Sequence, residues 1–235
     1  MKRVMLKLSG EALGKDGWLF DFDKINAVAD VLCEVSKEGF ELAVVIGGGN
    51  IWRGRKGGAI GMDAVSADNM GMLSTVLNAL CVKDAVERAG GKAEVFSAID
   101  MPGVCDTFRK DKAVKSLENG NITIFAGGLG RPFFTTDTAV VLRCLEIEAD
   151  LLLLAKNIDG VYTADPNTNP DATLIRDISY EEAIDRRLKV MDMSAFQMLS
   201  DRAFPMVRIF GLDDPKNILK VLKGDMMGTV LSPRR

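Results

Sequence analysis

The chain has 235 residues, of which 47% are hydrophobic and 27% are charged, and its net charge is −3. This length suits one α/β domain, and the charge gives no reason to expect binding to nucleic acid or to a membrane. Histidine is absent, which excludes Ser-His-Asp and Cys-His catalysis and histidine-ligated metals.

The N-terminal segment enters an apolar run at once. Residues 4–8 are apolar except for Lys7, so the run is too short for a signal peptide. No stretch reaches the roughly 20 apolar residues of a membrane-spanning helix, and we therefore expect a cytoplasmic protein. The cysteines form no C-x-x-C pair and are expected to be buried free thiols: Cys33, Cys81, Cys105 and Cys144.

Strand-like and helix-like segments alternate along the chain. Apolar runs predict strands at 4–8, 42–46, 95–96, 122–125, 151–154, 207–210 and 229–231. Apolar periodicity predicts helices after Asp21 and at about 62–89, 112–117, 138–147, 180–187 and 195–203, with one more near the C-terminus. The range 157–173 is rich in Asn, Asp, Pro and Gly and predicts a long loop. The pattern favours an α/β fold, a three-layer α/β/α sandwich around a central, mainly parallel sheet.

Three of the predicted strands end in glycine-rich sequence: KLSG at 7–10, IGGGN at 46–50 and GGLG at 127–130. Any one of these could be a tight turn. The carboxyl ends of parallel strands share one edge of a sheet, where ligands bind, and glycine amides can hold phosphate oxygens. Together the three loops predict a phosphate site, although neither the G-x-x-x-x-G-K-[ST] nor the G-x-G-x-x-G pattern is present.

Lys7 lies inside an apolar strand, directly before the first glycine loop. A buried lysine is costly unless it meets an anion, and a phosphate at the strand end would supply one; the alternative is a lysine that reaches water from an edge strand. Asp137 and Asp192 stand at predicted helix starts, where capping explains them as well as catalysis does. Phe133 and Phe134 could belong to the core.

Six segments keep a common order and spacing between residues 3 and 232: KLSGEAL (7–13), VVIGGGN (44–50) with Arg53-Gly54, Asp68 with MGM (70–72), PFFTTD (132–137), DGVYTADP (159–166) and KVMD (189–192). Together they resemble the amino acid kinase superfamily, and within it the bacterial UMP kinase branch. The resemblance covers nearly the whole chain and implies that family's fold.

The resemblance implies a single domain over 1–235, with an N-terminal lobe of about 1–148 that binds UMP and a C-terminal lobe of about 149–235 that binds ATP. It implies reversible transfer of the ATP γ-phosphoryl group to UMP, giving UDP and ADP for pyrimidine nucleotide (CTP) biosynthesis. Mg2+ would be bound with ATP and not by a dedicated metal site of the protein. A homohexamer, GTP activation and UTP inhibition are further expectations.

The resemblance also assigns site residues. ATP would contact Lys7, Leu8, Ser9, Gly10, Gly49, Arg53, Lys156, Asn157, Tyr162 and Asp165. UMP would contact Gly48, Asp68, Leu129, Gly130, Arg131, Pro132, Phe133, Phe134, Thr135 and Thr136. GTP would act at Lys15, Asp16, Gly17, Trp18, Leu19 and Phe20. The catalytic residues would be Lys7, Asp137 and Asp192, with Lys7 neutralising phosphoryl charge and the two aspartates organising lysines or the metal.

The sequence departs from the branch at a few positions. Leu129 and Arg131 replace a Thr and an Asn that the family often has, and Lys156 or Asn157 stands where it often has Thr. Two other hypotheses remain: a superfamily kinase that phosphorylates carbamate, acetylglutamate or aspartate, and a non-catalytic nucleotide-binding storage or sensor protein. The PFFTTD segment argues against the first, and the presence of Lys7 and Asp137 argues against the second.

Overall fold

A computed structural model describes residues 2–15, 17–53, 60–166, 168–188 and 190–234. Its main sheet has nine strands in the order β4-β3-β5-β2-β1-β6-β10-β11-β9. In chain order these are β1 (Arg3–Leu8), β2 (Glu41–Ile46), β3 (Ala93–Ser97), β4 (Asp106–Thr107), β5 (Ile122–Ala126), β6 (Leu151–Lys156), β9 (Asp177–Ser179), β10 (Val207–Gly211) and β11 (Thr229–Ser232). Every neighbouring pair is parallel except β10 with β11.

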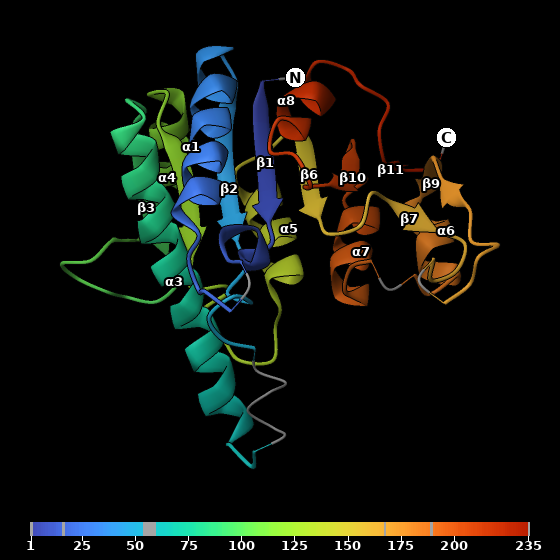
Figure 1. Ribbon diagram of the computed structural model, residues 1–235, viewed down its shortest axis with the longest axis horizontal. Coiled ribbons are helices and arrows are strands. Elements are labelled where there is room, and N and C mark those ends of the chain that lie inside the picture. The colour runs from blue at the N-terminus through green and yellow to red at the C-terminus, as the bar shows by residue number, and fades with distance from the viewer. Residues whose placement is uncertain (1, 16, 54–59, 167, 189, 235) are drawn as a thin grey trace.

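Helices cover both faces of this sheet (Figure 1). One face packs against α1 (Phe22–Lys37), α3 (Ala64–Arg88) and α8 (Asn217–Leu222). The other packs against α4 (Lys110–Glu118), α5 (Thr136–Glu146), α6 (Tyr180–Asp185) and α7 (Met193–Asp201). A short 3-10 helix, η1 (Gly10–Leu13), follows β1. The predicted three-layer α/β/α sandwich is therefore confirmed.

Strand β1 shows why the central strands read as apolar runs. Val4, Leu6 and Leu8 belong to the core beside α1 and α3, whereas Met5 belongs to the core on the opposite face. Successive side chains of a strand point to opposite faces, so a strand covered on both sides needs apolar residues throughout. Lys7 shares the face of Met5 and interrupts the second core.

The helix boundaries follow local signals. Asp21 caps α1, as predicted, by accepting from the backbone N–H groups of Asp23 and Lys24 at 3.1 and 3.2 Å. The chain leaves that helix at Gly39, whose φ is +89°, a conformation that glycine adopts without strain.

Short elements at the margins differ from the prediction. The predicted loop at 157–173 contains β7 (Val161–Tyr162), which pairs antiparallel with β8 (Leu174–Ile175). Strands β4 and β9 have two and three residues, too few to show a hydrophobic period.

All four cysteines are free, as predicted, but Cys81 and Cys105 are only half-buried. None of the described helices has the length and apolarity needed to cross a bilayer.

Candidate active site

The three glycine loops meet at one edge of the sheet, as predicted. They follow β1, β2 and β5, which are parallel neighbours, and the arrowheads of β1 and β2 point the same way in Figure 1. The first two loops touch closely: a Cβ on Gly10 would lie 2.3 Å from the carbonyl oxygen of Gly47 and 2.9 Å from the nitrogen of Gly49. Glycine at position 10 is therefore needed for the close contact between the two loops, in addition to any contact with a ligand.

Helix α3 holds the second and third loops in place. A Cβ on Gly48 would lie 2.8 Å from the Cβ of Ser74, so only glycine lets this loop reach the helix. Asn78 Nδ2 donates to the carbonyl oxygen of Gly47 at 2.7 Å, and the N–H of Gly127 donates to Thr75 Oγ1 at 2.8 Å. One rigid element thus fixes both loops.

The centre of the site is a carboxylate between two ammonium groups. Lys7 Nζ lies 2.8 Å from Asp137 Oδ1, and Lys156 Nζ lies 3.6 Å from Asp137 Oδ2. The three side chains are only 12%, 16% and 18% exposed for Lys7, Asp137 and Lys156. Lys156 also donates to the carbonyl oxygen of Val190. The anion beside Lys7 in the protein itself is thus the carboxylate of Asp137.

The sheet register explains this meeting. Strands β1 and β6 are parallel neighbours, with Lys7 opposite Leu154, and Lys156 follows Leu154 by two residues. The two lysines therefore project from the same face, which α5 covers. Asp137 lies in the first turn of α5 and so reaches both.

Electrostatics keep this centre charged. Burial alone would raise the pKa of Asp137, but the charges and hydrogen bonds of Lys7 and Lys156 outweigh it and hold the pKa below its ordinary value. The pKa of Lys156 is lowered, mainly because burial disfavours its charge and also because Lys7 is near, while Asp137 partly opposes this. Asp137 is therefore a carboxylate at neutral pH.

Asp192 joins the centre through hydroxyl groups. It occupies the N-cap position of α7, but its side chain makes no capping hydrogen bond. Its Oδ2 accepts instead from Thr135 Oγ1 and, at 3.2 Å, from Thr138 Oγ1. Thr135 in turn caps α5 by accepting from the N–H of Asp137 at 3.1 Å. Neither Asp137 nor Asp192 therefore caps a helix through its side chain.

A second polar cluster, absent from the sequence prediction, centres on Glu11. Its carboxylate forms an ion pair with Arg53 and accepts from Asn157 Nδ2 at 2.7 Å. These residues come from η1, the end of the second glycine loop and the end of β6. The cluster therefore joins the ranges 1–148 and 149–235 beside the glycine loops. The two residues at the position where the family often has Thr therefore make separate contacts. Lys156 contacts Asp137, and Asn157 contacts Glu11.

The segment assigned to UMP lies against the start of α3. The N–H of Phe133 donates to Asp68 Oδ2 at 2.8 Å, and Phe133 has a φ of +69°. Phe133 and Phe134 are 72% and 54% exposed, so the alternative that they are core residues is wrong. The segment runs from Leu129 through Gly130, Arg131 and Pro132 to Thr135 and Thr136, where α5 begins.

A cavity of about 640 Å³ lies beyond Lys156. It is lined by Lys156, Tyr162 and Asp165, and also by Leu188 and Val190. Tyr162 donates its hydroxyl hydrogen to Asp159 Oδ1 at 2.8 Å. Three residues assigned to ATP thus share one cavity, while Asn157 does not line it.

Of the residues assigned to GTP, 15 and 17–20 form a short excursion beside the second glycine loop. Lys15 and Trp18 form an antiparallel bridge, and Trp18 is 78% exposed. Asn50 Nδ2 donates to the carbonyl oxygen of Leu19 at 2.8 Å. Asp16 lies outside the described residues. The excursion is therefore tied to the loop through Asn50.

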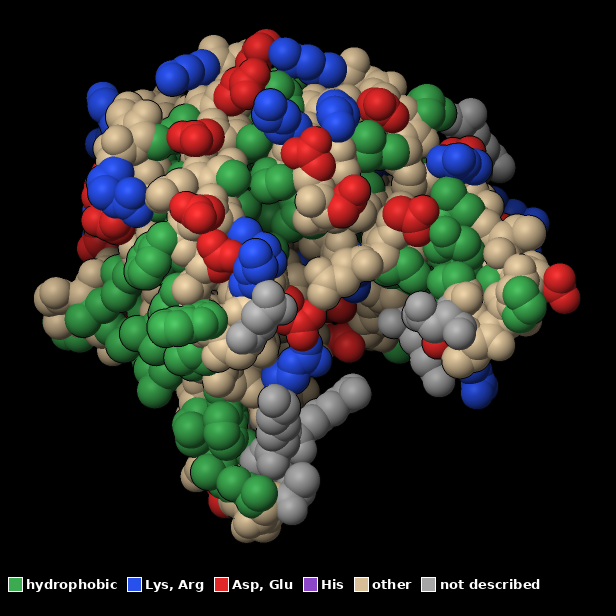
Figure 2. All heavy atoms as spheres, in the orientation of Figure 1, with side chains coloured by type: hydrophobic (Ala, Val, Ile, Leu, Met, Phe, Trp, Pro, Cys, Tyr) green, Lys and Arg blue, Asp and Glu red, His purple; other side chains and the backbone are tan. Residues whose placement is uncertain are grey.

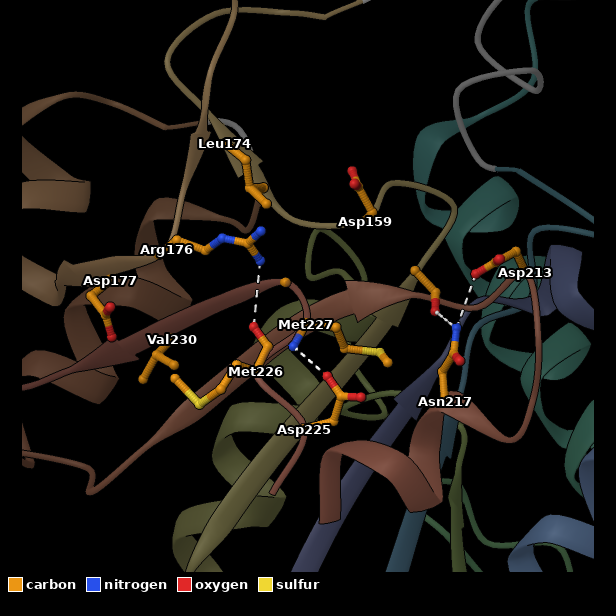
Figure 3. Close-up of a pocket in the computed structure, with 12 residues that line it drawn as sticks. Asp159, Leu174, Arg176, Asp177, Asp213, Asn217, Asp225, Met226, Met227 and Val230 are labelled. Atoms are coloured by element: carbon orange, nitrogen blue, oxygen red, sulfur yellow. Dashed lines mark hydrogen bonds between the residues drawn. The ribbon is translucent and has the colours of Figure 1, made fainter. Parts of the chain in front are cut away.

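A second cavity, of about 750 Å³, lies on the other face of the sheet, beside α8 (Figure 3). Its side chains bind one another: Asn217 Nδ2 donates to Asp213 Oδ1 at 3.0 Å, and Arg176 donates to the carbonyl oxygen of Met226 at 3.4 Å. It is separate from the lysine centre.

Comparison with known proteins gives the family. The model of the amino acid kinase family matches residues 2–210. The chain belongs to the amino acid kinase family. A uridylate kinase of Xanthomonas oryzae pv. oryzae and one of Xanthomonas campestris pv. campestris are each 47% identical to this chain over 234 residues, covering 99% of this chain and 97% of theirs.

Solved structures agree. The UMP kinase of Bacillus anthracis superposes on this chain with a TM-score of 0.95 at 34% identity, over 100% of this chain and 97% of its own. The UMP kinase of Ureaplasma parvum superposes with a TM-score of 0.92 at 35% identity, over 98% of each chain. The resemblance to the bacterial UMP kinase branch is thereby confirmed.

Proposed function

We propose that this chain is a UMP kinase that transfers the γ-phosphoryl group of ATP to UMP, giving UDP and ADP, in pyrimidine nucleotide (CTP) biosynthesis. The observation that carries the proposal is the Lys7–Asp137–Lys156 centre at the meeting point of three glycine loops. The 47% identity to uridylate kinases over nearly the whole chain supports UMP as the acceptor.

Lys7 stabilises the charge of the phosphoryl group during transfer. Its ammonium group is fixed by Asp137, so little reorganisation is needed when charge develops, and a preorganised donor in a poorly solvated site is effective for that reason. The backbone N–H groups of Gly10 and Gly49 would add donors to the phosphates. Phosphoryl transfer depends mainly on such positioning and charge stabilisation.

No general base is needed, because the acceptor oxygen of UMP belongs to a phosphate and is already anionic. The lowered pKa of Asp137 fits a residue that holds two lysines in place better than one that takes up a proton. Asp192, bonded to the hydroxyl groups of Thr135 and Thr138, orders the start of α5 and thereby Asp137.

The two nucleotides would meet end to end at the edge of the sheet. ATP would place its base and ribose in the cavity of Tyr162 and Asp165, within the C-terminal lobe of about 149–235. UMP would lie on the segment 129–136 with Asp68 and Gly48, within the N-terminal lobe of about 1–148. The molecule is hollowed between the projecting end of α3 and the part that carries α6 and β7, with charged side chains at the mouth (Figure 2).

Mg2+ would enter with ATP. The ion would be held mainly by phosphate oxygens and water. Among the described residues Asp192 makes no ion pair, so it is the carboxylate of the centre that would add a ligand. The ion supplies further neutralisation of phosphate charge.

Association into a homo-oligomer, expected to be a hexamer, belongs to the same proposal. Large apolar side chains remain exposed along α3: Val65, Met70, Leu73 and Leu77 are 39–52% exposed. Exposed apolar stripes of this kind often mark contacts between subunits. GTP activation at residues 15–20, UTP inhibition and a cytoplasmic location remain predictions. Light scattering would test the hexamer, and ADP release measured with and without GTP or UTP would test the two effectors.

The test is an ADP-release assay with ATP, Mg2+ and one acceptor at a time: UMP, CMP, carbamate or acetylglutamate. The proposal predicts ADP release that depends on UMP. Turnover with carbamate or acetylglutamate and none with UMP would mean a different kinase of the family. Nucleotide binding without turnover of any acceptor would indicate a storage or sensor protein.

A further inference from the structure

Asn78 is a fully buried amide in the middle of α3. It is 0% exposed, and a buried amide is costly unless its polar groups are hydrogen-bonded. Its Nδ2 donates to the carbonyl oxygen of Gly47 at 2.7 Å and to Asn50 Oδ1 at 2.8 Å. Its Oδ1 accepts from Asn50 Nδ2 at 3.1 Å. Both ends of the amide therefore bind the second glycine loop.

Main-chain carbonyl groups determine which way the two amides face. A carbonyl oxygen only accepts hydrogen bonds, so the nitrogen of Asn78 has to face Gly47. The nitrogen of Asn50 has to face Leu19 for the same reason, since it donates to that carbonyl oxygen at 2.8 Å. The oxygen of each amide then meets the nitrogen of the other. The hydrogen bond from Asn78 to Gly47 is thus held in place by a reciprocal pair.

This hydrogen bond sets the direction of the next backbone N–H group. The C=O and N–H groups of a trans peptide point in opposite directions, and the carbonyl group of Gly47 points to α3. The N–H of Gly48 therefore points away from α3. On that side lies the start of α5, since a Cβ on Gly47 would be 3.7 Å from Thr136 Oγ1. Helix α5 covers the face of the sheet from which Lys7 projects, so the N–H of Gly48 is turned towards the side of that lysine.

Helix α3 treats the second and third glycine loops in opposite ways. At the second loop Asn78 binds a carbonyl group and leaves the N–H of Gly48 for a ligand. At the third loop Thr75 Oγ1 accepts from the N–H of Gly127 at 2.8 Å and so uses that donor within the protein. Free backbone N–H groups form anion-binding sites. The side chains of α3 therefore favour the second loop as the place where a phosphate is bound through the backbone.

The peptide between Gly47 and Gly48 needs a side chain to keep this orientation. Glycine adopts a wide range of φ and ψ angles, and a peptide with glycine on both sides can turn over at little cost. Its carbonyl oxygen would then face the phosphate and repel it. Donors that are already oriented towards developing charge contribute most to transfer, so the orientation of this peptide matters for the reaction.

We propose that Asn78 is a positioning residue of the reaction. By holding the carbonyl oxygen of Gly47, it aims the N–H of Gly48 at the phosphate of UMP, and it touches neither nucleotide itself. Asn50 supports it through the reciprocal amide pair. The inference rests on the proposed function in taking UMP as the ligand at Gly48.

The test compares the binding of UMP with that of uridine, which has the same base and ribose but no phosphate. Asn78→Leu keeps the size of the side chain and removes its donors. Asn50→Ala keeps the hydrogen bond to Gly47 but removes its support. Val82→Ala is the matched control, because Val82 is fully buried on the same helix and its truncation costs stability without changing an amide. Calorimetry would measure UMP, an NMR titration would measure uridine, and a thermal melt would compare the stabilities.

We expect Asn78→Leu to bind UMP about ten- to a hundredfold more weakly, the range for a lost hydrogen bond to a charged group, with uridine affinity within about twofold. Asn50→Ala should lose about three- to tenfold for UMP alone, and Val82→Ala should change neither affinity.

An equal loss for UMP and uridine, or an unchanged affinity for UMP, would overturn the role of Asn78. If Asn78→Leu does not fold, Asn50→Ala decides by the same comparison. Failure of the proposed function would show in the wild type, which would then not bind UMP, and this inference would fall with it.

Discussion

Lys7 Nζ lies 2.8 Å from Asp137 Oδ1, and this ion pair joins a central strand to the helix that covers it. Both side chains are less than one-fifth exposed, so the pair is positioned by the sheet and by α5 and not by chance contact at the surface. The glycine loops meet at the same strand ends. The pair therefore stands where the phosphates of two nucleotides would come together.

Lys7→Ala should abolish most turnover without unfolding the protein. Loss of one preorganised donor to a transition state costs about a hundred- to a thousandfold in kcat, and Asp137 keeps Lys156 as a partner, so the fold should persist. ADP release and a thermal melt would be measured on the same preparation, with Lys112→Ala as the control. Turnover close to that of the wild type would reject the role of Lys7.

Asp137→Asn should make the free energy of unfolding depend less on pH in the acidic range. The folded-state pKa of Asp137 lies below its ordinary value of 3.8, so its charge stabilises the folded protein above that value. This contribution is lost as the pH falls through the folded-state pKa. Urea unfolding at several pH values should show a difference between wild type and variant that is largest at neutral pH and shrinks below about pH 4. A difference that does not change with pH would contradict the ion pair.

Asp68→Ala should weaken the binding of the acceptor UMP and leave the binding of the donor ATP unchanged. Asp68 accepts from the N–H of Phe133, so its loss frees the segment assigned to UMP. We expect the KM for UMP to rise about tenfold, in line with one lost charged hydrogen bond, with the KM for ATP unchanged. Asp84→Ala is the control, since Asp84 lies on the same helix but pairs only with Arg88 among the described residues. Equal changes in both KM values would argue against the assignment.

Gly10→Ala should destabilise the protein by about 1–3 kcal/mol, the usual cost of forcing atoms into a packed region. The new Cβ would meet the backbone of Gly47 at 2.3 Å, which cannot move aside as a flexible side chain would. Gly71→Ala, on α3, is the control, because its nearest neighbour would be 3.9 Å away and alanine favours a helix. Urea unfolding of both variants would check this, and equal stabilities would show that the loops are not in close contact.

The sequence predicted the main sheet because the central strands are largely apolar on both faces, as in residues 4–8 apart from Lys7. It predicted the start of α1 because Asp21 is a capping residue. It predicted the meeting of the glycine loops because parallel strands share an edge. It did not predict that Lys156 faces Asp137, since that follows from the register of β1 with β6. Nor did it predict the cluster around Glu11, which depends on the end of β6 reaching η1, or the left-handed backbone of Phe133.

The most direct measurement follows the phosphoryl group itself. ATP labelled at the γ-phosphate would be incubated with UMP, Mg2+ and either the wild type or Lys7→Ala, and the products would be separated by chromatography. We expect the label to appear in UDP with the wild type and to be almost absent from UDP with the variant. Label released only as inorganic phosphate, or UDP labelled equally by both proteins, would contradict it.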